Sequence, residues 1–171
     1  MARVLKALAW SLGILIVAAG VLLVVARSLD GPIGPVPGGS LVSGDWVRTQ
    51  GLDWSFVVGL DSRPEMQLLS SPRSRTLSMV HHEGALFLPA GRPLGGRWKQ
   101  WSQEALEDGR AILRIAGKRY AVTLVRASET ERVAILALEI EEHDLDPVEA
   151  ADPDLLWVFR VEPRERLADE A

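Results

Sequence analysis

The sequence contains no cysteine, and this absence excludes several kinds of chemistry at once. Disulfide bonds, a thiol nucleophile and the cysteine lipidation of bacterial lipoproteins all need a residue that the chain lacks. The chain also lacks a serine in a Gly-x-Ser-x-Gly setting, which forms the nucleophile turn of many hydrolases. Hydrolysis through a covalent intermediate is therefore weakly supported. The absence of thiols is compatible with an oxidising compartment.

Charge is absent from residues 7–26, which read ALAWSLGILIVAAGVLLVVA. Twenty helical residues span ~30 Å, the thickness of a bilayer core, so this run predicts a transmembrane helix. The alternative is a secretory signal cleaved near residue 26. The apolar run is longer than the ~7–15 residues of a signal core, which favours an uncleaved anchor.

The flanks of this run predict its orientation. Arg3, Lys6 and the amino terminus precede it, whereas Arg27 and Asp30 follow it. Because cytoplasmic flanks carry an excess of lysine and arginine, the N-terminus is predicted to lie in the cytoplasm. The expected location is the inner (plasma) membrane, with a single pass and with the rest of the chain outside, in the periplasm.

The whole chain has a net charge of only −4, but its charge is unevenly distributed. Residues 63–119 carry ten Lys/Arg and five Asp/Glu, whereas residues 127–171 carry four Lys/Arg and fourteen Asp/Glu. A nucleic-acid-binding protein needs a dominant basic face, so no nucleic-acid partner is expected. The basic middle suits a small anionic ligand better, although any single charge there is ordinarily part of a solvated surface.

The composition divides the chain into three parts. Residues 1–26 form the transmembrane anchor with its short N-terminal flank. Residues 27–44 are rich in Gly and Pro, cannot hold a regular helix, and are predicted to be a stem that lifts the domain off the membrane. Residues 45–171 form the folded domain, whose C-terminal part is acidic.

Short runs of strand-forming residues dominate the folded domain. Gly84 and Gly117 are placed to form the tight turns of two hairpins, which cover residues 76–89 and 111–126. The full set of predicted strands covers residues 57–60, 66–70, 76–81, 85–89, 111–115, 118–126 and 155–161. Tyr120 is interpreted as a packed residue of one of these strands.

Two helices interrupt the strands. Residues 98–108 place Trp98, Trp101 and Ala105 on one face. Residues 128–141 open with the capping-box spacing of Ser128 and Glu131. The residues that the second helix is expected to bury are Val133, Leu136, Ala137 and Ile140. This order of elements predicts a mainly β (α+β) fold, in which the transmembrane helix precedes a split antiparallel β-barrel with two or three flanking helices.

No metal site is predicted. His81 and His82 are adjacent, and neighbouring residues of a strand point to opposite faces of a sheet. A third ligand is missing, because His143 lies in an acidic segment. The carboxylates of that segment are interpreted as a solvated charge run rather than as a catalytic pair.

Two groups of donors are the better candidates for a binding site. Arg73, Arg75, Thr76 and Ser78 stand at the start of one predicted strand, and a Gly-rich loop leads to basic residues before the first helix. The candidates on that second stretch are Arg92, Arg97, Trp98 and Lys99. Guanidinium and hydroxyl donors with a helix start would bind an oxyanion such as a phosphate, if the two stretches meet in space.

The two stretches RTLSMVHHEGALFLPAG and GGRWKQWSQEALEDGRAILRIAGKRYAVTLVRAS resemble the split β-barrel superfamily over residues 53–140. That superfamily includes pyridoxamine-phosphate-oxidase-like flavoproteins and deazaflavin-dependent nitroreductases. The resemblance implies FMN or a deazaflavin as cofactor, with its phosphate held by the basic strand start and by the loop before the helix. The residues so implicated are Arg73, Arg75, Thr76, Ser78, Arg97, Trp98 and Lys99.

The hypothesis for function is a membrane-anchored protein that binds a flavin-like or deazaflavin-like cofactor and that would act as an oxidoreductase on a small molecule. Trp98 or Trp101 would cover an apolar ring, and no catalytic residue is assigned. The alternative is a cofactor-free, membrane-tethered interaction or accessory module on the same fold. Because split barrels of this kind are commonly dimers, the resemblance also implies a homodimer.

Overall fold

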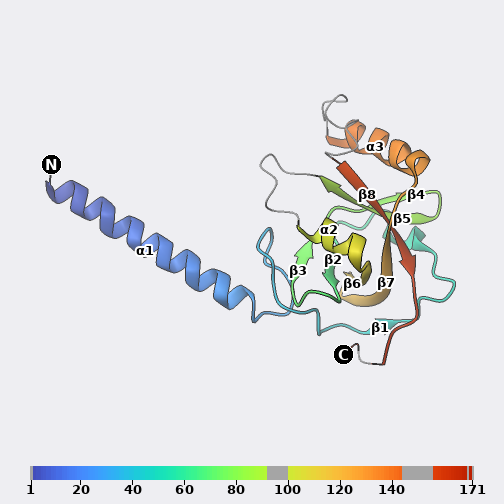
Figure 1. The fold of residues 1–171 in the computed structure, drawn as a ribbon, viewed down its shortest axis with the longest axis horizontal. Coiled ribbons are helices and arrows are strands. Elements are labelled where there is room, and N and C mark those ends of the chain that lie inside the picture. Colours follow the sequence, from blue (N-terminus) through green and yellow to red (C-terminus); the bar gives the residue numbers. More distant parts are fainter. Residues whose placement is uncertain (1, 92–99, 144–155, 169, 171) are drawn as a thin grey trace.

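The computed structural model describes residues 2–91, 100–143, 156–168 and 170. In chain order the elements are α1 (Ala2–Ala26), β1 (Trp46–Val47), the 3₁₀ helix η1 (Trp54–Val57), β2 (Glu65–Leu68), β3 (Ser74–Thr76), β4 (Val80–His82), β5 (Ala85–Gly91), α2 (Gln100–Glu107), β6 (Arg110–Ile115), β7 (Lys118–Arg126), α3 (Glu129–His143) and β8 (Leu156–Pro163). Figure 1 shows α1 projecting away from a domain built around one curled sheet.

The sheet is antiparallel along the order β3-β2-β6-β7-β8-β5-β4, and β1 pairs in parallel with β7. Its two edge strands, β3 and β4, are separated by only three residues of chain. The same stretch of backbone therefore pairs with β2 at one edge and with β5 at the other. This arrangement curls the sheet into a half-barrel, and it confirms the predicted split antiparallel barrel with flanking helices.

Both predicted hairpins are confirmed, and each has a tight two-residue turn. Glu83 and Gly84 have φ values of 48° and 78°, and Ala116 and Gly117 have values of 48° and 76°. Two successive residues with positive φ form the turn whose twist matches that of the paired strands. Glycine in the second position lowers the cost of that conformation.

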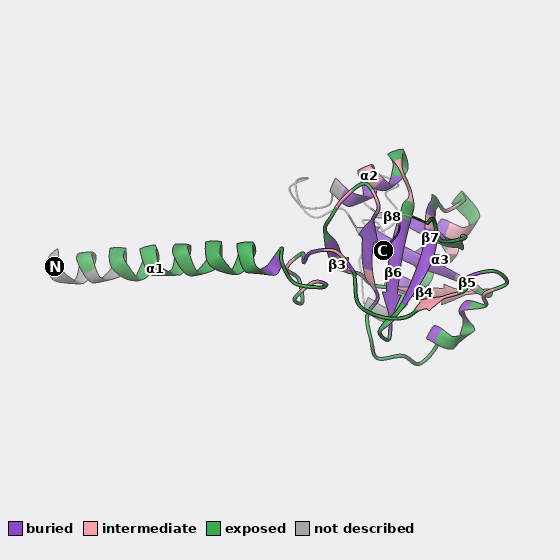
Figure 2. Ribbon diagram, turned by 90° about the horizontal axis from the view of Figure 1, so that it is seen from below, coloured by how far each residue is buried: buried purple, intermediate pink, exposed green. Residues whose placement is uncertain are grey.

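The main core lies inside the curl of the sheet, where Figure 2 shows β6 and β7 to be largely buried and β4 to be of intermediate burial. Trp101 and Ala105 of α2 pack into this core, with the Trp101 ring 5.4 Å from that of Phe159. Tyr120 is buried as predicted and is stacked on Phe56 at 5.7 Å, and burial raises the pKa of its hydroxyl. A smaller cluster, in which Ile135 is fully buried, lies beneath α3.

Two predicted strands are wrong: residues 76–81 are divided between the end of β3 and β4, with residues 77–79 outside both, and residues 57–60 form no strand. Residues 57–60 lie in and after η1, where the Asp53 side chain accepts a hydrogen bond from the Ser55 N–H at 2.9 Å. This cap starts a turn that buries Trp54 and Val57, three residues apart. A short apolar run is compatible with either a strand or a helical turn, and the aspartate decides between them.

The predicted cap of α3 is confirmed, but its buried face is only partly so. The Ser128 N–H donates to Glu131, and the Glu131 N–H donates back to the Ser128 hydroxyl. Leu136 is buried as predicted, whereas Val133 is 54% exposed and Ala137 is also exposed. The buried stripe of this helix consists of Arg132, Ile135, Leu136 and Glu139. Apolar residues of α3 are distributed around its circumference, so their spacing in the sequence does not specify which face packs against the domain.

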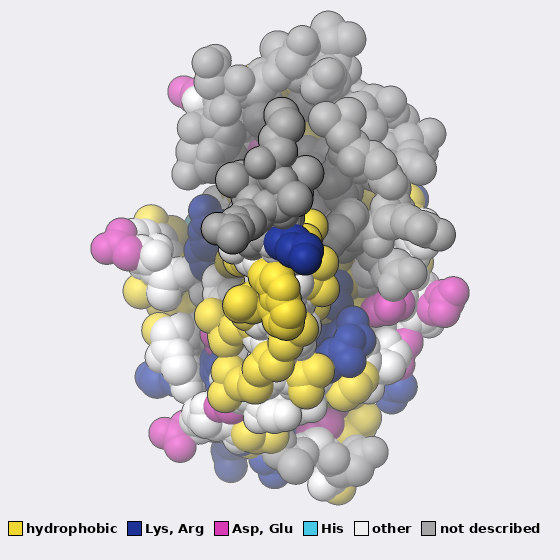
Figure 3. Space-filling model, turned by 90° about the vertical axis from the view of Figure 1, so that its left-hand side faces the viewer, with side chains coloured by type: hydrophobic (Ala, Val, Ile, Leu, Met, Phe, Trp, Pro, Cys, Tyr) yellow, Lys and Arg dark blue, Asp and Glu magenta, His cyan; other side chains and the backbone are white. Residues whose placement is uncertain are grey.

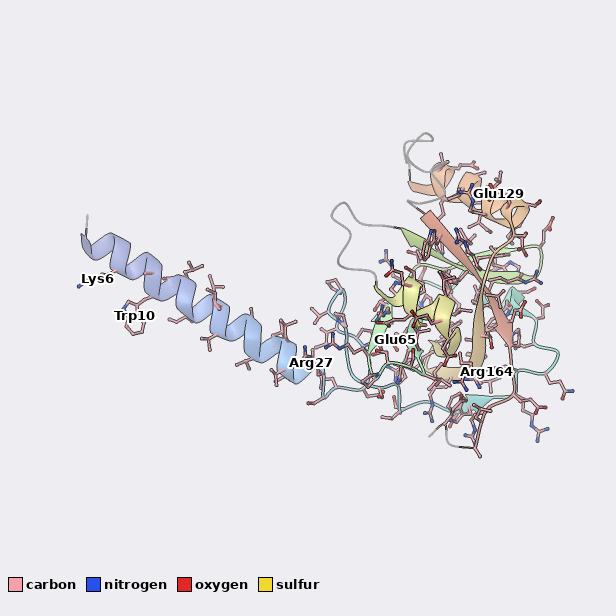
Figure 4. The ribbon with its side chains drawn as sticks, viewed as in Figure 1. Lys6, Trp10, Arg27, Glu65, Glu129 and Arg164 are labelled. Atoms are coloured by element: carbon pink, nitrogen blue, oxygen red, sulfur yellow. The ribbon has the colours of Figure 1, made fainter. Side chains whose placement is uncertain are left out.

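α1 has the length and the composition of a membrane-spanning helix over Ala9–Ala26. Almost none of that stretch is buried against the domain. In Figure 3, which views the molecule from the side on which α1 projects, hydrophobic side chains gather over this helix. Lys6 and Trp10 lie along its outer half, and Arg27 lies where it meets the domain (Figure 4).

The stem segment, residues 27–44, is folded against the sheet. Gly38 exchanges backbone hydrogen bonds with Ser74 on β3, and the buried Ser74 hydroxyl donates to the Gly39 carbonyl at 2.6 Å. The Leu41 N–H donates to the Gln67 side chain at 2.8 Å, and Leu41 is only 1% exposed. The Gly and Pro content excluded a helix here, but it did not predict these contacts.

Candidate functional site

The basic strand start lies on β3, the edge strand next to β2. Ser74 and Thr76 alternate with Arg75 along this strand, so Arg75 points to the opposite face of the sheet. On that face Arg75 approaches α2, while Ser74 binds the stem segment. Of the four candidates predicted from this stretch, Arg75 and Thr76 lie on β3 and point to opposite sides of the sheet, whereas Arg73 and Ser78 flank the strand.

Arg75 is half-buried, and its guanidinium lies over the Trp101 ring at 6.0 Å from the centroid. Its Nε atom is buried and has no hydrogen-bond partner among the described residues. Burial lowers the pKa of this guanidinium, the charge of Glu104 opposes that effect, and the charge of Arg73 adds to it. Arg75 thus has one donor, Nε–H, that has lost water without gaining an acceptor among the described residues, which is a costly arrangement in a folded protein.

Glu104 is the second unsatisfied group at this place. It lies on α2 one turn after Trp101, and its Oε2 atom is buried without a hydrogen-bond partner. Among the described residues the site therefore holds an unused donor on β3 and an unused acceptor on α2, close enough for the charge of Glu104 to raise the pKa of Arg75. A bound group with an anionic oxygen and a hydroxyl would satisfy both.

The remaining described candidates lie farther from this pair of groups. Arg73 is exposed, but its charge acts on Arg75. Thr76 is half-buried and pairs with Glu65 on β2. Ser78 is exposed and lines a separate hollow of about 180 Å³ together with Met79 and other residues. The structure thus associates Arg73 with Arg75 but not Ser78.

Arg92, Arg97, Trp98 and Lys99 lie outside the described residues. That these four residues lie close to Arg73 and Arg75 in space stays a prediction. Trp101, the other tryptophan considered as a cover for a ring, is only 2% exposed. Because Phe159 and Arg75 both contact its ring, Trp101 serves to position Arg75.

Sequence reasoning missed Glu104. The signal that would have found it is the helical spacing, because residues three apart on a helix share a face and Trp101 marks the buried face of α2. The unsatisfied state of its carboxylate depends on the packing of α2 against the sheet.

Sequence reasoning also missed a second group of arginines, around Trp46 on β1. The guanidinium groups of Arg119 and Arg166 lie 4.5 Å and 5.3 Å from the Trp46 ring centroid. Arg48 and Glu165 line the adjoining hollow of about 440 Å³. These stacked contacts attach the C-terminal segment to β1 and β7, which is a structural role.

Within the described parts of the chain, no group of three or more His, Cys, Asp or Glu side chains is arranged to hold a metal ion. The Nε2 atom of His81 is buried without a hydrogen-bond partner.

No known protein-family model matches the sequence, and no curated protein matches it. Among solved structures, the fold is similar to a Listeria innocua protein solved under the name pyridoxamine 5'-phosphate oxidase. The similarity has a TM-score of 0.46 at 13% sequence identity, and it covers 60% of this chain and 84% of that one. At this level the likeness concerns the course of the chain and carries no conclusion about a ligand.

Proposed function

We propose that this protein is a membrane-anchored split-barrel protein that binds the phosphate-bearing part of a flavin-like or deazaflavin-like cofactor beside Arg75. The observation that carries the proposal is the buried, unpartnered Nε atom of Arg75. A phosphate oxygen would provide the acceptor that this donor lacks, and the resulting charge-assisted bond is among the stronger ones in proteins.

The residues present fit such a group in two respects. Arg73 places a second positive charge near Arg75, so the two guanidinium groups would share the charge of a phosphate. Glu104 would accept a hydrogen bond from a hydroxyl, and the sugar-alcohol chain of FMN carries hydroxyls next to its phosphate. The carboxylate of Glu104 also repels a phosphate, so it would limit the affinity and favour a ligand that offers a hydroxyl there.

When bound, a flavin or deazaflavin supplies hydride-transfer chemistry to a small molecule. The contribution of the chain would be to bind and orient the cofactor. Arg75 is held by Trp101, which is itself fixed in the core against Phe159. A donor on so rigid a support has little side-chain freedom left to lose on binding.

The anchoring part of the proposal is supported by α1. Its apolar stretch Ala9–Ala26 is long enough to cross a bilayer and makes almost no contact with the domain. With the cytoplasmic N-terminus predicted from the flanking charges, the barrel would lie outside the inner membrane.

The test is a titration of the full chain with FMN and, separately, with a deazaflavin, in non-ionic detergent micelles. Binding is measured by the quenching of tryptophan fluorescence. We expect saturable quenching, weaker binding by Arg75→Gln, and unchanged binding by Arg160→Gln, an exposed arginine on β8 that pairs with Glu131. Glu104→Gln should bind FMN a few-fold more tightly, because it removes the repelling charge. Equal binding by all four proteins would overturn the assignment of Arg75.

A cofactor-free interaction module is the second candidate. It is favoured by an apolar groove of about 400 Å³ between the loop after η1, β4 and α3. Val58 and Leu138 in this groove are 66% and 37% exposed. Absence of quenching by every flavin and deazaflavin would favour this candidate over the first. A homodimer through this groove is a prediction that sedimentation of the same preparation would check.

A further inference from the structure

The first part of the stem segment leaves the last turn of α1 and returns to it. Ser28 N–H donates to the Val25 carbonyl at 2.9 Å, so the chain leaves the helix by a tight turn. The Gly39 N–H then donates to the Leu29 carbonyl at 3.0 Å, which closes residues 29–39 into a loop. A side chain at Gly39 would meet the Arg27 carbonyl oxygen at 2.5 Å, so the two ends of the loop are in close contact. The loop therefore cannot move far from the end of α1.

The same loop is fixed to the domain. Gly38 pairs with the buried Ser74, and a side chain at Gly38 would lie 1.7 Å from the Gly31 carbonyl oxygen. Asp30 accepts hydrogen bonds from the N–H groups of Val42 and Ser43 and from the Arg114 guanidinium. A linker that served only as a spacer would need none of these contacts.

The stem segment carries two charged residues, the exposed Arg27 and Asp30. Residues 31–44 contain no charged residue, and the carboxylate of Asp30, the last charge before them, is bound by Arg114. Apart from Asp30 and Gly34, the exposed positions of the loop are apolar: Leu29 is 41% exposed, Ile33 is 44% exposed, and Pro35 and Pro37 are exposed. Exposed apolar side chains are unfavourable in bulk water but suit the interfacial layer of a bilayer.

Geometry places this loop at the level of the lipid headgroups. If Ala26 lies at the edge of the bilayer core, a headgroup layer about 5–7 Å thick follows immediately. A loop closed onto Ala26–Leu29 has to lie in or beside that layer. Figure 1 shows the segment between the end of α1 and β3, on the side of the domain from which the helix projects.

We propose that the loop of residues 29–39 rests in the lipid interface through Leu29, Ile33 and the exposed prolines. It is a second membrane contact, and it fixes which face of the barrel lies toward the bilayer. The partner is the bilayer itself, argued from the continuity of the loop with the membrane helix. This proposal rests on α1 spanning the membrane, as the proposed function states.

The absence of cysteine allows a clean test, because any single cysteine introduced can be labelled alone. The full chain is reconstituted into phosphatidylcholine vesicles with an environment-sensitive dye on one of three variants: Ile33→Cys for the loop, Val17→Cys for the middle of α1, and Thr130→Cys. Thr130 is exposed next to Glu129, which Figure 4 shows on the part of the domain far from α1. Quenchers are placed either shallow or deep on the lipid chains.

We expect the dye at position 33 to be quenched by shallow quenchers, the dye at position 17 by deep ones, and the dye at position 130 by neither. If position 17 is quenched while position 33 behaves like position 130, the loop does not contact lipid and the span stands. If position 17 escapes quenching, α1 does not span the bilayer, and both the anchor and the loop contact are overturned.

Discussion

Two regions of this domain each contain an arginine with buried donor atoms. The guanidinium of one is engaged in hydrogen bonds to carboxylates, whereas the other has a buried donor without an acceptor among the described residues. Arg114 on β6 is buried and donates hydrogen bonds to Asp30, Glu65 and Ser43. Burial lowers the pKa of its guanidinium, but the bonds to the two carboxylates outweigh burial and the pKa is raised. Arg75 on β3 has a half-buried side chain with an unpartnered Nε atom and a lowered pKa.

This difference separates an arginine that stabilises the fold, Arg114, from the arginine that we propose as a ligand contact, Arg75. Arg114 joins the stem segment to β2 and β6, so its partners are part of the chain. The Arg75 Nε atom has no hydrogen-bond partner among the described residues, so an acceptor from a ligand would improve its environment. Removal of Arg114 should therefore damage stability, whereas removal of Arg75 should damage binding.

The largest expected effect on stability comes from Trp101, whose ring lies beneath the Arg75 guanidinium. Trp101→Ala would empty a site that is 2% exposed and packed on Phe159. We expect a loss of about 3–5 kcal/mol in the free energy of unfolding, as for other buried aromatic side chains. Guanidinium unfolding of the full chain in micelles measures it. A loss comparable to that of an exposed substitution would show that α2 does not pack on the core.

Arg114→Met should have the next largest effect. It leaves Asp30 and Glu65 without their cation, although their side chains are 28% and 27% exposed and water compensates in part. We expect a loss of about 2 kcal/mol, below the range for fully buried pairs. Arg160→Gln, whose side chain is 47% exposed, should cost less than about 1 kcal/mol. Equal losses in the two variants would contradict the structural role of Arg114.

The Asp30 carboxylate should make this region sensitive to acid. Burial raises its pKa, but hydrogen bonds from Ser43, Val42 and Arg114 outweigh burial, and the net pKa is below the ordinary 3.8. A group whose pKa is lowered by folding stabilises above its unfolded value and loses that contribution as the pH falls through the folded value. Wild-type stability should therefore decline below pH 3.8 more steeply than that of Asp30→Asn. If the free energy of unfolding falls with pH equally steeply in the wild type and in Asp30→Asn, the Asp30 carboxylate makes no such contribution.

Arg75→Gln should have the smallest effect on stability and a clear effect on binding. Its contact with Trp101 is worth about 0.5–1 kcal/mol, and removing a poorly solvated charge offsets part of that. We expect a change below about 1 kcal/mol in unfolding and an FMN affinity lower by at least tenfold, about 1.4 kcal/mol. A large loss of stability with unchanged affinity would reverse the roles assigned to the two arginines.

The comparison also shows what the sequence could predict. The hairpins were accessible because Gly84 and Gly117 mark turns by local chemistry, and the Ser128 cap was accessible for the same reason. Arg75 was predicted as a candidate because donors at the start of a strand suit oxyanions, and its role in binding stays a prediction. The Asp30–Arg114 bond joins residues 84 positions apart, so local pattern carries no information about it. The buried state of Glu104 likewise depends on tertiary packing.

The most direct test of the central claim follows the Nε–H groups of Arg75 and Arg114 by ¹⁵N NMR while FMN is added to the full chain in non-ionic micelles. The Arg75→Gln and Arg114→Met variants assign the two signals. We expect the Arg75 signal to shift on addition of FMN, because the unpartnered donor gains an acceptor, while the Arg114 signal stays in place. An Arg75 signal that is unmoved at saturating FMN would contradict the account.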